Sequence, residues 1–331
     1  MMPTRLSRVG PNVALVVALA LGLVGYAQAQ SGYPNRPVKM LVGFAAGGGT
    51  DVAARIVAQK MSEILGQSVV VENVPGASGM VAAQDVAKAD PDGYTLMMGS
   101  QTTYACAPNL YHKVTIDPVK DFAPIALTGA SPLILVANPS FAAHTVADVI
   151  ALAKAEPGKI NFGTGGVGTT PHMTAELFQH DAGIKLVHVP YRGEAGAIND
   201  VLGGQIPIMF ANLSAVMGNI KGGTLRAIAV TSAKRSPSVP DVPTVAESGI
   251  PGFEAETWFG IVAPAGTPRD IVLKLNAAAR QAVAAEDTKQ RFAQVGMTNA
   301  SSSPEELAAY IKAEIAKWSK VIKDADIQAL D

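Results

Sequence analysis

The sequence predicts an α/β protein built as two lobes, and three observations support this prediction. The chain has 331 residues, which is more than one ordinary domain needs and indicates about two. A strand-length apolar segment, a glycine-rich turn and an amphipathic helix follow one another at residues 38–66, and the same order returns at residues 159–178. Hydrophobic residues make up 48% of the chain and charged residues 16%, so each lobe has enough apolar surface for a packed core.

The first half of the chain alternates strands and helices. We expect strands at residues 38–44, 68–71 and 94–99, a helix that Thr50 or Asp51 caps and Gly66 ends, and another helix at residues 80–89. Crossover helices between such strands predict parallel pairing. Two more short strands are expected at residues 125–127 and 133–136, with a lobe boundary near Ala130.

The second half repeats this plan with a different sequence. We expect helices at residues 146–155, 195–202, 270–284 and 304–325, and a further helix after Pro171 that contains Met173, Leu177 and Phe178. We expect strands at residues 159–163, 186–189, 206–210, 225–230 and 259–263. Four prolines between residues 236 and 252 indicate a long ordered linker over the surface.

The N-terminus has the features of a secretory signal. Arg5 and Arg8 precede an apolar run at residues 13–24, and Ala27 and Ala29 are the small residues that a signal peptidase requires. The run is shorter than the roughly 20 residues that cross a bilayer, so we expect no stable membrane insertion. We therefore predict a signal peptide at residues 1–29, cleavage after Ala29, and a periplasmic protein.

Charge and cysteine content exclude several classes of protein. Lys and Arg number 26 against 27 Asp and Glu, and this net charge of -1 offers no basic field for nucleic acid. The single Cys106 excludes an intramolecular disulfide and a cysteine zinc cluster, and we expect a buried thiol.

Two glycine-rich loops, one in each half, are the candidate binding elements. Each links a buried strand to a helix N-terminus, where unpaired N–H groups and the helix dipole favour an anion. Glycine lets the backbone approach a ligand and adopt unusual dihedral angles. The threonines beside the glycines add hydroxyl donors. We therefore expect a cleft between the lobes in which both loops hold a carboxylate.

Enzyme motifs are incomplete in this sequence. Residues 163–168 match G-x-G-x-x-G, but the acidic residue that binds ribose is missing from the next strand, and Glu194 lies beyond it in a loop. A Walker motif, a G-x-S-x-G elbow and H-E-x-x-H are absent. We expect no enzyme activity, no cofactor and no metal.

Other side chains are candidates with two interpretations each. Arg192 either pairs with a second ligand carboxylate or forms an ordinary ion pair. Phe44 and Trp258 either line the cleft or pack in the core, and His172 either touches the cleft or simply begins a helix. The expected ligand-binding residues are Phe44, Gly48, Gly49, Thr50, Asp51, Thr164, Gly165, Gly168, Thr169, Thr170, His172, Tyr191, Arg192 and Trp258.

Nine short segments, in order, resemble one known family. They are residues 33–38 (YPNRPV), 42–51 (VGFAAGGGTD), 71–79 (VENVPGASG), 91–96 (PDGYTL), 161–169 (NFGTGGVGT), 189–193 (VPYRG), 241–244 (DVPT), 258–260 (WFG) and 263–268 (APAGTP). The chain resembles the Bug-type extracytoplasmic receptors of tripartite tricarboxylate transporters over nearly all of its mature length. Departures are small: Ala45 or Ala46 stands where the family often has proline, and Thr169 where serine is common.

This resemblance implies a type II periplasmic-binding-protein fold of the Venus-flytrap kind. Lobe 1 then comprises residues 30–130 plus 250–331, and lobe 2 residues 131–249. The implied function is capture of a small carboxylate, which is a di- or tricarboxylate, an amino acid or an aromatic acid, for delivery to the membrane components of the transporter. We expect a monomer. A secreted hydrolase, or a solute-presenting protein coupled to a sensor kinase, are the alternatives.

Overall fold

The computed structural model describes residues 32–111, 116–324 and 327. The chain divides into two units, residues 1–35 and residues 36–331, and the second contains every helix and strand described below. The expected signal peptide and its cleavage site after Ala29 lie outside the described residues. Among the described helices, none is long and apolar enough to cross a membrane.

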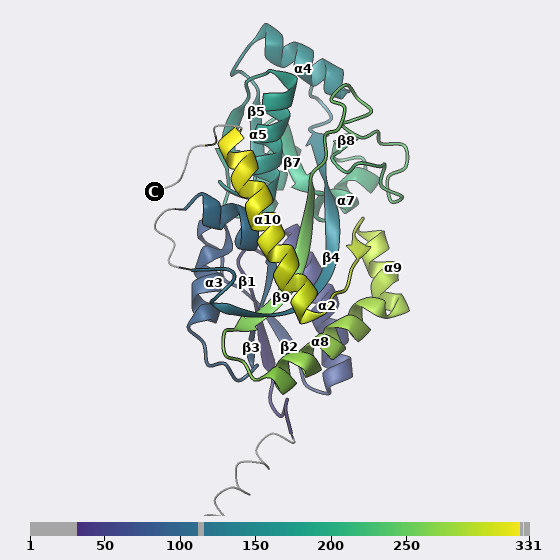
Figure 1. Ribbon diagram of the computed structural model, residues 1–331. Coiled ribbons are helices and arrows are strands. Elements are labelled where there is room, and N and C mark those ends of the chain that lie inside the picture. Colours follow the sequence, from purple (N-terminus) through teal and green to yellow (C-terminus); the bar gives the residue numbers. More distant parts are fainter. Residues whose placement is uncertain (1–31, 112–115, 325–326, 328–331) are drawn as a thin grey trace, which may run out of the picture. The chain divides into compact units, whose positions relative to one another are not determined.

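One long strand, β4 (Phe122–Ala137), connects two sheet regions (Figure 1). Its residues 122–132 pair with β9, and its residues 133–137 pair with β7 and β8. The described strands follow the order β2-β1-β3-β9-β4-β7-β5-β6, with β8 and β10 pairing with β4 beside that path. The first sheet region contains β1 (Val38–Val42), β2 (Val69–Asn73), β3 (Thr95–Ser100), β9 (Glu256–Pro264), β10 (Thr298–Asn299) and the first part of β4. The second contains β5 (Asn161–Thr164), β6 (Val187–Pro190), β7 (Ile208–Asn212), β8 (Arg226–Val230) and the rest of β4.

Strand direction agrees with the sequence prediction only in part. β1 pairs in parallel with β2 and β3, and β5 pairs in parallel with β6 and β7, as the crossover helices predict. β4 and β9 are antiparallel to their neighbours, so the parallel pairing predicted from the crossover helices does not extend to these two strands. The two short strands expected at residues 125–127 and 133–136 are parts of β4. Gly129 and Pro132 suggest a break, but register shifts against β9 absorb the irregularity and the strand continues.

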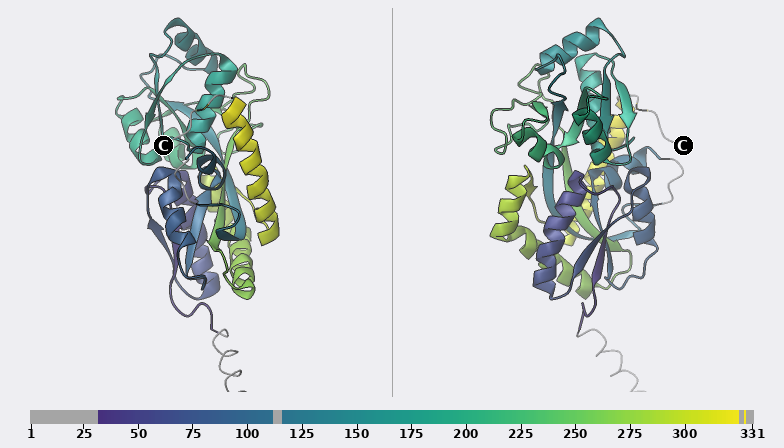
Figure 2. Two further views of the ribbon diagram at one scale, coloured as in Figure 1. Left: turned by 60° about the vertical axis from the view of Figure 1, so that its left-hand side comes forward. Right: turned by 180° about the vertical axis from the view of Figure 1, so that it is seen from behind.

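Helices lie against the strands of both sheet regions (Figures 1 and 2). Those of the first region are α2 (Gly49–Leu65), α3 (Met80–Ala87), α8 (Arg269–Ala284), α9 (Glu286–Gln294) and α10 (Pro304–Asp324). Those of the second are α4 (Val146–Ala155), α5 (Thr170–Ala182), α6 (Glu194–Leu202) and α7 (Leu213–Lys221). Short helical turns are η1 (Ala77–Gly79), η2 (Thr102–Cys106) and η3 (Ala107–Asn109). Residues 236–252 form turns with one bridge to β8, as expected of a linker.

The sequence prediction missed two helices and misplaced one cap. α9 buries only two of its side chains, Thr288 and Phe292, so its apolar periodicity is weak. α7 follows β7 without a loop and contains Gly218, which lowers helix propensity. α2 begins at Gly49 with Gly48 as its N-cap, so the expected capping by Thr50 or Asp51 is wrong.

The alternation of side chains along the strands produces two cores in the second sheet region. Ile208 and Phe210 of β7 face the cluster that α4 and α5 cover, whereas Met209 and Ala211 face the cluster that α6 and α7 cover. In the first region, Trp258 of β9 packs with side chains of β1, β3 and α10. The C-terminal part of α10 reaches α5, because Trp318 and Met173 share a cluster with the buried Cys106. α10 therefore contacts both sheet regions (Figure 1).

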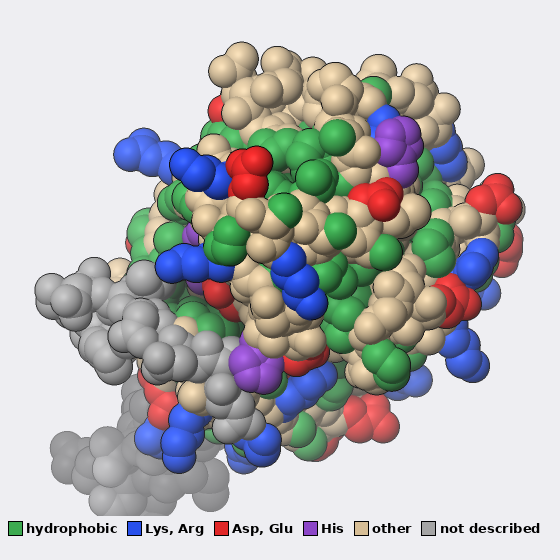
Figure 3. Space-filling view, turned by 90° about the horizontal axis from the view of Figure 1, so that it is seen from above, with side chains coloured by type: hydrophobic (Ala, Val, Ile, Leu, Met, Phe, Trp, Pro, Cys, Tyr) green, Lys and Arg blue, Asp and Glu red, His purple; other side chains and the backbone are tan. Residues whose placement is uncertain are grey.

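Surface charges of both signs are interspersed. Figure 3 shows this on the face at the α4 end, where Lys and Arg alternate with Asp and Glu among apolar and polar side chains. The near-zero net charge of -1 fits this distribution. The face offers no stripe of one sign that would suit a nucleic-acid backbone.

Candidate functional site

The first glycine loop leads from β1 into α2 and is fixed by Asp51. Its carboxylate accepts hydrogen bonds of 2.9 Å from the N–H of Gly47, from Arg55 Nε and from Asn73 Nδ2. Burial raises the pKa of this carboxyl, but these hydrogen bonds and the Arg55 charge bring the pKa below its usual value. Asp51 thus shapes the loop and does not line the cavity described below.

A buried carboxylate from the other half of the chain occupies the N-terminus of α2. Glu194, the first residue of α6, accepts a hydrogen bond from the N–H of Gly49 through Oε2 at 2.9 Å. Its Oε1 accepts bonds from the N–H and the Nδ2 of Asn212 at 2.7 and 3.0 Å. The side chain is 7% exposed, and burial raises the pKa of Glu194. Sequence reasoning placed this residue in a loop and missed its role.

Close approach explains the glycines of the first loop. A Cβ on Gly49 would lie 2.7 Å from Cβ of Asn212, and a Cβ on Gly48 would lie 3.3 Å from Oε2 of Glu194. Gly48 has an ordinary φ of -80°, so the expectation of unusual dihedral angles fails there. At Gly47, where φ is 88°, that expectation is correct.

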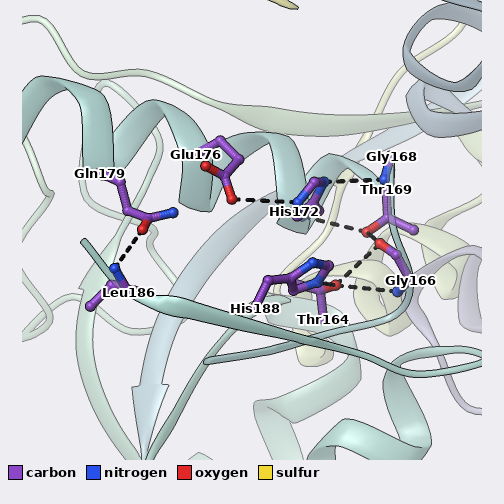
Figure 4. A network of polar contacts seen from close by, with 9 residues as sticks. All are labelled: Thr164, Gly166, Gly168, Thr169, His172, Glu176, Gln179, Leu186 and His188. Atoms are coloured by element: carbon purple, nitrogen blue, oxygen red, sulfur yellow. Dashed lines mark hydrogen bonds and ion pairs between the residues drawn. The ribbon is translucent and has the colours of Figure 1, made fainter. Parts of the chain in front are cut away.

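The second glycine loop leads from β5 into α5 and is held by a histidine pair (Figure 4). Oγ1 of Thr164 lies 2.6 Å from Nε2 of His188, and the N–H of Gly168 donates to Nδ1 of His172 at 3.1 Å. The two imidazole rings stack with centroids 4.1 Å apart. Burial, followed by the neighbouring His172, lowers the pKa of His188 to about 3. Thr164, Gly168 and His172 therefore form hydrogen bonds that hold the second loop and the start of α5 together, and none of the three lines the cavity described below.

The second glycine loop and the start of α5 also bond to residues of the first sheet region outside the first glycine loop. The N–H of Thr170, the first residue of α5, donates to Oγ1 of Thr102 in η2 at 2.8 Å, and the two hydroxyl oxygens are 3.0 Å apart. Nearby, Ser78 Oγ and Tyr111 Oη both donate to the carbonyl of Val167 in the second loop. Thr169 caps α5, and its hydroxyl also donates to the carbonyl of Gly166 at 2.7 Å. The bonds of Thr102, Ser78 and Tyr111 connect the first sheet region to the second, whereas those of Thr169 stay within the second loop.

A small cavity lies between the glycine loops. Its volume is about 20 Å³, which is room for about one water molecule. Seven of the twelve lining residues are polar, and Glu194 is the ionisable one. The lining residues are Phe44, Gly48, Gly49, Thr50, Ser100, Thr102, Gly165, Thr169, Pro171, Glu194, Asn212 and Thr257.

Two buried polar atoms of this lining have no hydrogen-bond partner within the described part of the chain. They are Oδ1 of Asn212, whose residue is 5% exposed, and Oγ1 of Thr257, whose residue is 2% exposed. Buried polar atoms in native proteins are nearly always paired. The lining therefore has hydrogen-bonding capacity that the protein itself does not use.

A larger hollow adjoins the cavity and contains two more of the expected residues. Its volume is about 520 Å³, and it shares Phe44 and Gly165 with the cavity. Arg192 and Tyr191 line it, and the Tyr191 hydroxyl donates to Oδ2 of Asp200 at 2.5 Å. Arg192 therefore lies beside the cavity and is not part of its lining.

Trp258 belongs to the core. It is 3% exposed, its Nε1 donates to Oε2 of Glu314 at 3.0 Å, and its ring stacks on Tyr104 with centroids 5.8 Å apart. Of the two interpretations of this residue, core packing is correct. Phe44, in contrast, lines both the cavity and the hollow.

Of the twelve residues that line the cavity, six were expected from the sequence and six were missed. Phe44 is one of the expected six, and Thr102, Pro171 and Thr257 are among those missed. Gly48, Gly49, Thr50, Gly165 and Thr169 were also expected, whereas Ser100, Glu194 and Asn212 were missed as well. Across the described residues, no group of three or more His, Cys, Asp and Glu side chains is arranged to hold a metal ion. The hydroxyl groups and helix N-termini beside this cavity suit a small anionic organic molecule.

The chain is similar in sequence to a known protein family and to its members. Residues 53–327 match the family described as tripartite tricarboxylate transporter family receptor. Protein BugT of Bordetella pertussis is 36% identical over 312 residues, which cover 93% of this chain and 96% of that protein.

Solved structures agree with this family match. The periplasmic binding protein BugD is 36% identical with a TM-score of 0.87, covering 90% of this chain and 100% of that one. R. palustris Rpa4515, solved with adipate, is 36% identical with a TM-score of 0.88 and the same coverage. MatC from Rhodopseudomonas palustris, solved with bound malate, is 33% identical with a TM-score of 0.82, covering 88% of this chain and 100% of that one.

Proposed function

The chain belongs to the family of tripartite tricarboxylate transporter receptors, and on that premise we propose that it captures a small carboxylate in the cavity between its two glycine loops. This family consists of periplasmic solute-binding receptors of the Bug type, which are not enzymes. The hydrolase considered from the sequence is therefore set aside. Two relatives of the same fold were solved with adipate and with malate.

The observation that carries this proposal is the unused hydrogen-bonding capacity of the cavity. The Thr257 hydroxyl is buried without a partner among the described residues, and Thr50 and Ser100 add hydroxyl groups to the same lining. Thr50 also lies in the first turn of α2, where N–H groups have no partner within the helix. A carboxylate accepts from such donors without needing a cationic side chain.

We propose that the sheet regions move apart to admit the solute. A cavity of about 20 Å³ is too small for a dicarboxylate, so entry requires a wider arrangement. The proposed moving parts are the two lobes expected from the sequence, residues 30–130 plus 250–331 and residues 131–249. Separation breaks the bonds from Gly49 to Glu194 and from Thr170 to Thr102. Two-state lobe motion of this kind is common in binding proteins that close around a ligand.

The proposal also covers the location of the protein in the cell and the proteins with which it interacts. Residues 1–29 direct export and are removed after Ala29, and the mature monomer delivers its solute to the membrane components of a tripartite transporter. Intact-mass measurement of the periplasmic product tests the cleavage: the expected N-terminus is Gln30, and an uncleaved membrane-bound chain would contradict the prediction.

A thermal-shift screen tests the binding function. The full chain is expressed, purified from the periplasm and heated with mono-, di- and tricarboxylates. A ligand that binds only the folded state raises the melting temperature, and at 100 times its Kd it stabilises by about 2.7 kcal/mol. We expect at least one carboxylate to do so and calorimetric titration to show one site per chain. If no carboxylate shifts the melting temperature, the proposed function is wrong.

A further inference from the structure

The Glu194 carboxylate has one acceptor position left. Its Oε1 accepts two hydrogen bonds from Asn212, and its Oε2 accepts one from Gly49. An ionised carboxylate offers about four acceptor positions, so one position on Oε2 stays open. Glu194 touches both glycine loops, because a Cβ on Gly165 would lie 3.2 Å from its Cγ.

Asn212 adds a second open acceptor beside the first. Its Nδ2 donates to Oε1 of Glu194, which fixes the orientation of the amide, since the opposite orientation would set Oδ1 against the carboxylate. Oδ1 is then a buried acceptor without a partner in the described residues, and it belongs to the cavity lining. Both open positions require a donor, which a carboxylate of the solute cannot supply.

The described lining of the cavity offers no cationic side chain to pair with the Glu194 carboxylate. Glu194 is the ionisable residue of the described lining, and none of the lining side chains is lysine, arginine or histidine. A buried carboxylate without a cation is costly, and a solute with a second carboxylate at this place would add repulsion. Burial raises the pKa of Glu194, which agrees with this cost. A cationic donor on the solute would pair with the carboxylate and would replace the repulsion by attraction.

We propose that Glu194 and Asn212 select a solute that carries an ammonium group in addition to its carboxylate, that is, an amino-carboxylate. This inference rests on the proposed function, because the carboxylate of the same molecule binds the hydroxyl groups and the first turn of α2. The ammonium group donates to Oε2 of Glu194 and to Oδ1 of Asn212. Glu194 thereby acts as a specificity-determining residue as well as a link between the loops.

Matched pairs of acids test this selection in the wild-type protein. The pairs are succinate and aspartate, glutarate and glutamate, adipate and 2-aminoadipate, and butyrate and 4-aminobutyrate, each measured by calorimetric titration. We expect the amino acid of the best-fitting pair to bind at least tenfold more tightly than its partner. If every partner without an amine binds equally or better, the selection is overturned while the receptor function stands. If no carboxylate of any class binds, the proposed function itself fails.

Variants separate selection from structural support. Glu194→Gln keeps the size of the side chain and removes its charge, so we expect the preference for the amine to fall at least tenfold. Glu286→Gln is the matched control, because Glu286 is also the first residue of a helix but is exposed on α9. A purely structural Glu194 would lower the melting temperature and weaken both members of each pair equally, and that result would overturn the proposal. If Glu194→Gln does not fold, the titrations of the wild-type protein with the matched pairs of acids decide by themselves whether an amine is selected.

Discussion

The N–H of Gly49 donates to Oε2 of Glu194 over 2.9 Å and thereby joins the first turn of α2 to the first turn of α6. The acceptor is a carboxylate of the protein at a helix N-terminus, which is a favourable place for an anion. The same side chain approaches Gly165 in the second loop. One residue therefore connects the two elements that the sequence predicts as the binding site.

The first prediction concerns the space at Gly49. A methyl group added to Gly49 would lie 2.7 Å from Cβ of Asn212, so Gly49→Ala forces this contact apart. We expect a loss of about 1–3 kcal/mol of folding free energy, as in overpacked cores, together with weaker ligand binding.

Gly218→Ala is the control, because Gly218 is an exposed residue of α7 and no atom lies within 4 Å of the added methyl group. It should stabilise by up to about 1 kcal/mol through helix propensity. Urea unfolding measures both; equal stability of the two variants would contradict the close-packing argument.

The second prediction uses two neighbouring threonines in η2. Thr102→Val removes the acceptor of the Thr170 N–H and leaves that donor buried, which costs about 1–3 kcal/mol. Thr103→Val is the control, since Oγ1 of Thr103 is buried without a partner in the described part of the chain and its loss should be neutral or stabilising. Thermal unfolding compares the two. A Thr103→Val variant as unstable as Thr102→Val would show that the hydrogen bond between α5 and η2 contributes no more to stability than an unpaired hydroxyl group does.

The third prediction concerns acid stability and His188. The folded protein lowers the pKa of His188 to about 3, whereas an unfolded chain has the ordinary value near 6.5. Between these values the unfolded state binds the extra proton, so stability falls as the pH drops through this window. The slope from one group is at most about 1.4 kcal/mol per pH unit. In His188→Gln the free energy of unfolding, measured in urea at pH 4 to 7, should fall less steeply. Parallel curves for wild type and variant would contradict the prediction.

Local sequence patterns predicted the parts of the site that local structure creates. Both glycine loops follow a strand and precede a helix, and the residues that encode them are contiguous. Glu194, Ser100 and Asn212 were missed because they reach the cavity from the start of α6 and from the ends of β3 and β7. These residues come together only through the order of the strands in the sheet. That order depends on β4 and β9, and the sequence around these two strands has no strand–helix–strand pattern that would predict their neighbours. A glutamate that opens a helix directly after Gly193 was the one local clue.

The last prediction decides between the cavity and Arg192 as the main anchor of the solute carboxylate. Arg192 lines the hollow next to the cavity, so we expect its positive charge to attract an approaching anion without contacting the bound carboxylate. We expect Arg192→Ala to slow association and weaken its salt dependence, while the dissociation rate stays within a factor of about two. Arg280→Ala, which removes the same charge from the exposed surface of α8, is the control and should change neither rate. Stopped-flow measurement of both rates checks this. If Arg192 were the main anchor, Arg192→Ala would break a charge-assisted pair. Dissociation would then be faster, and binding would lose about 2–5 kcal/mol of free energy. That result would mean that the carboxylate binds to Arg192 and not to the glycine loops.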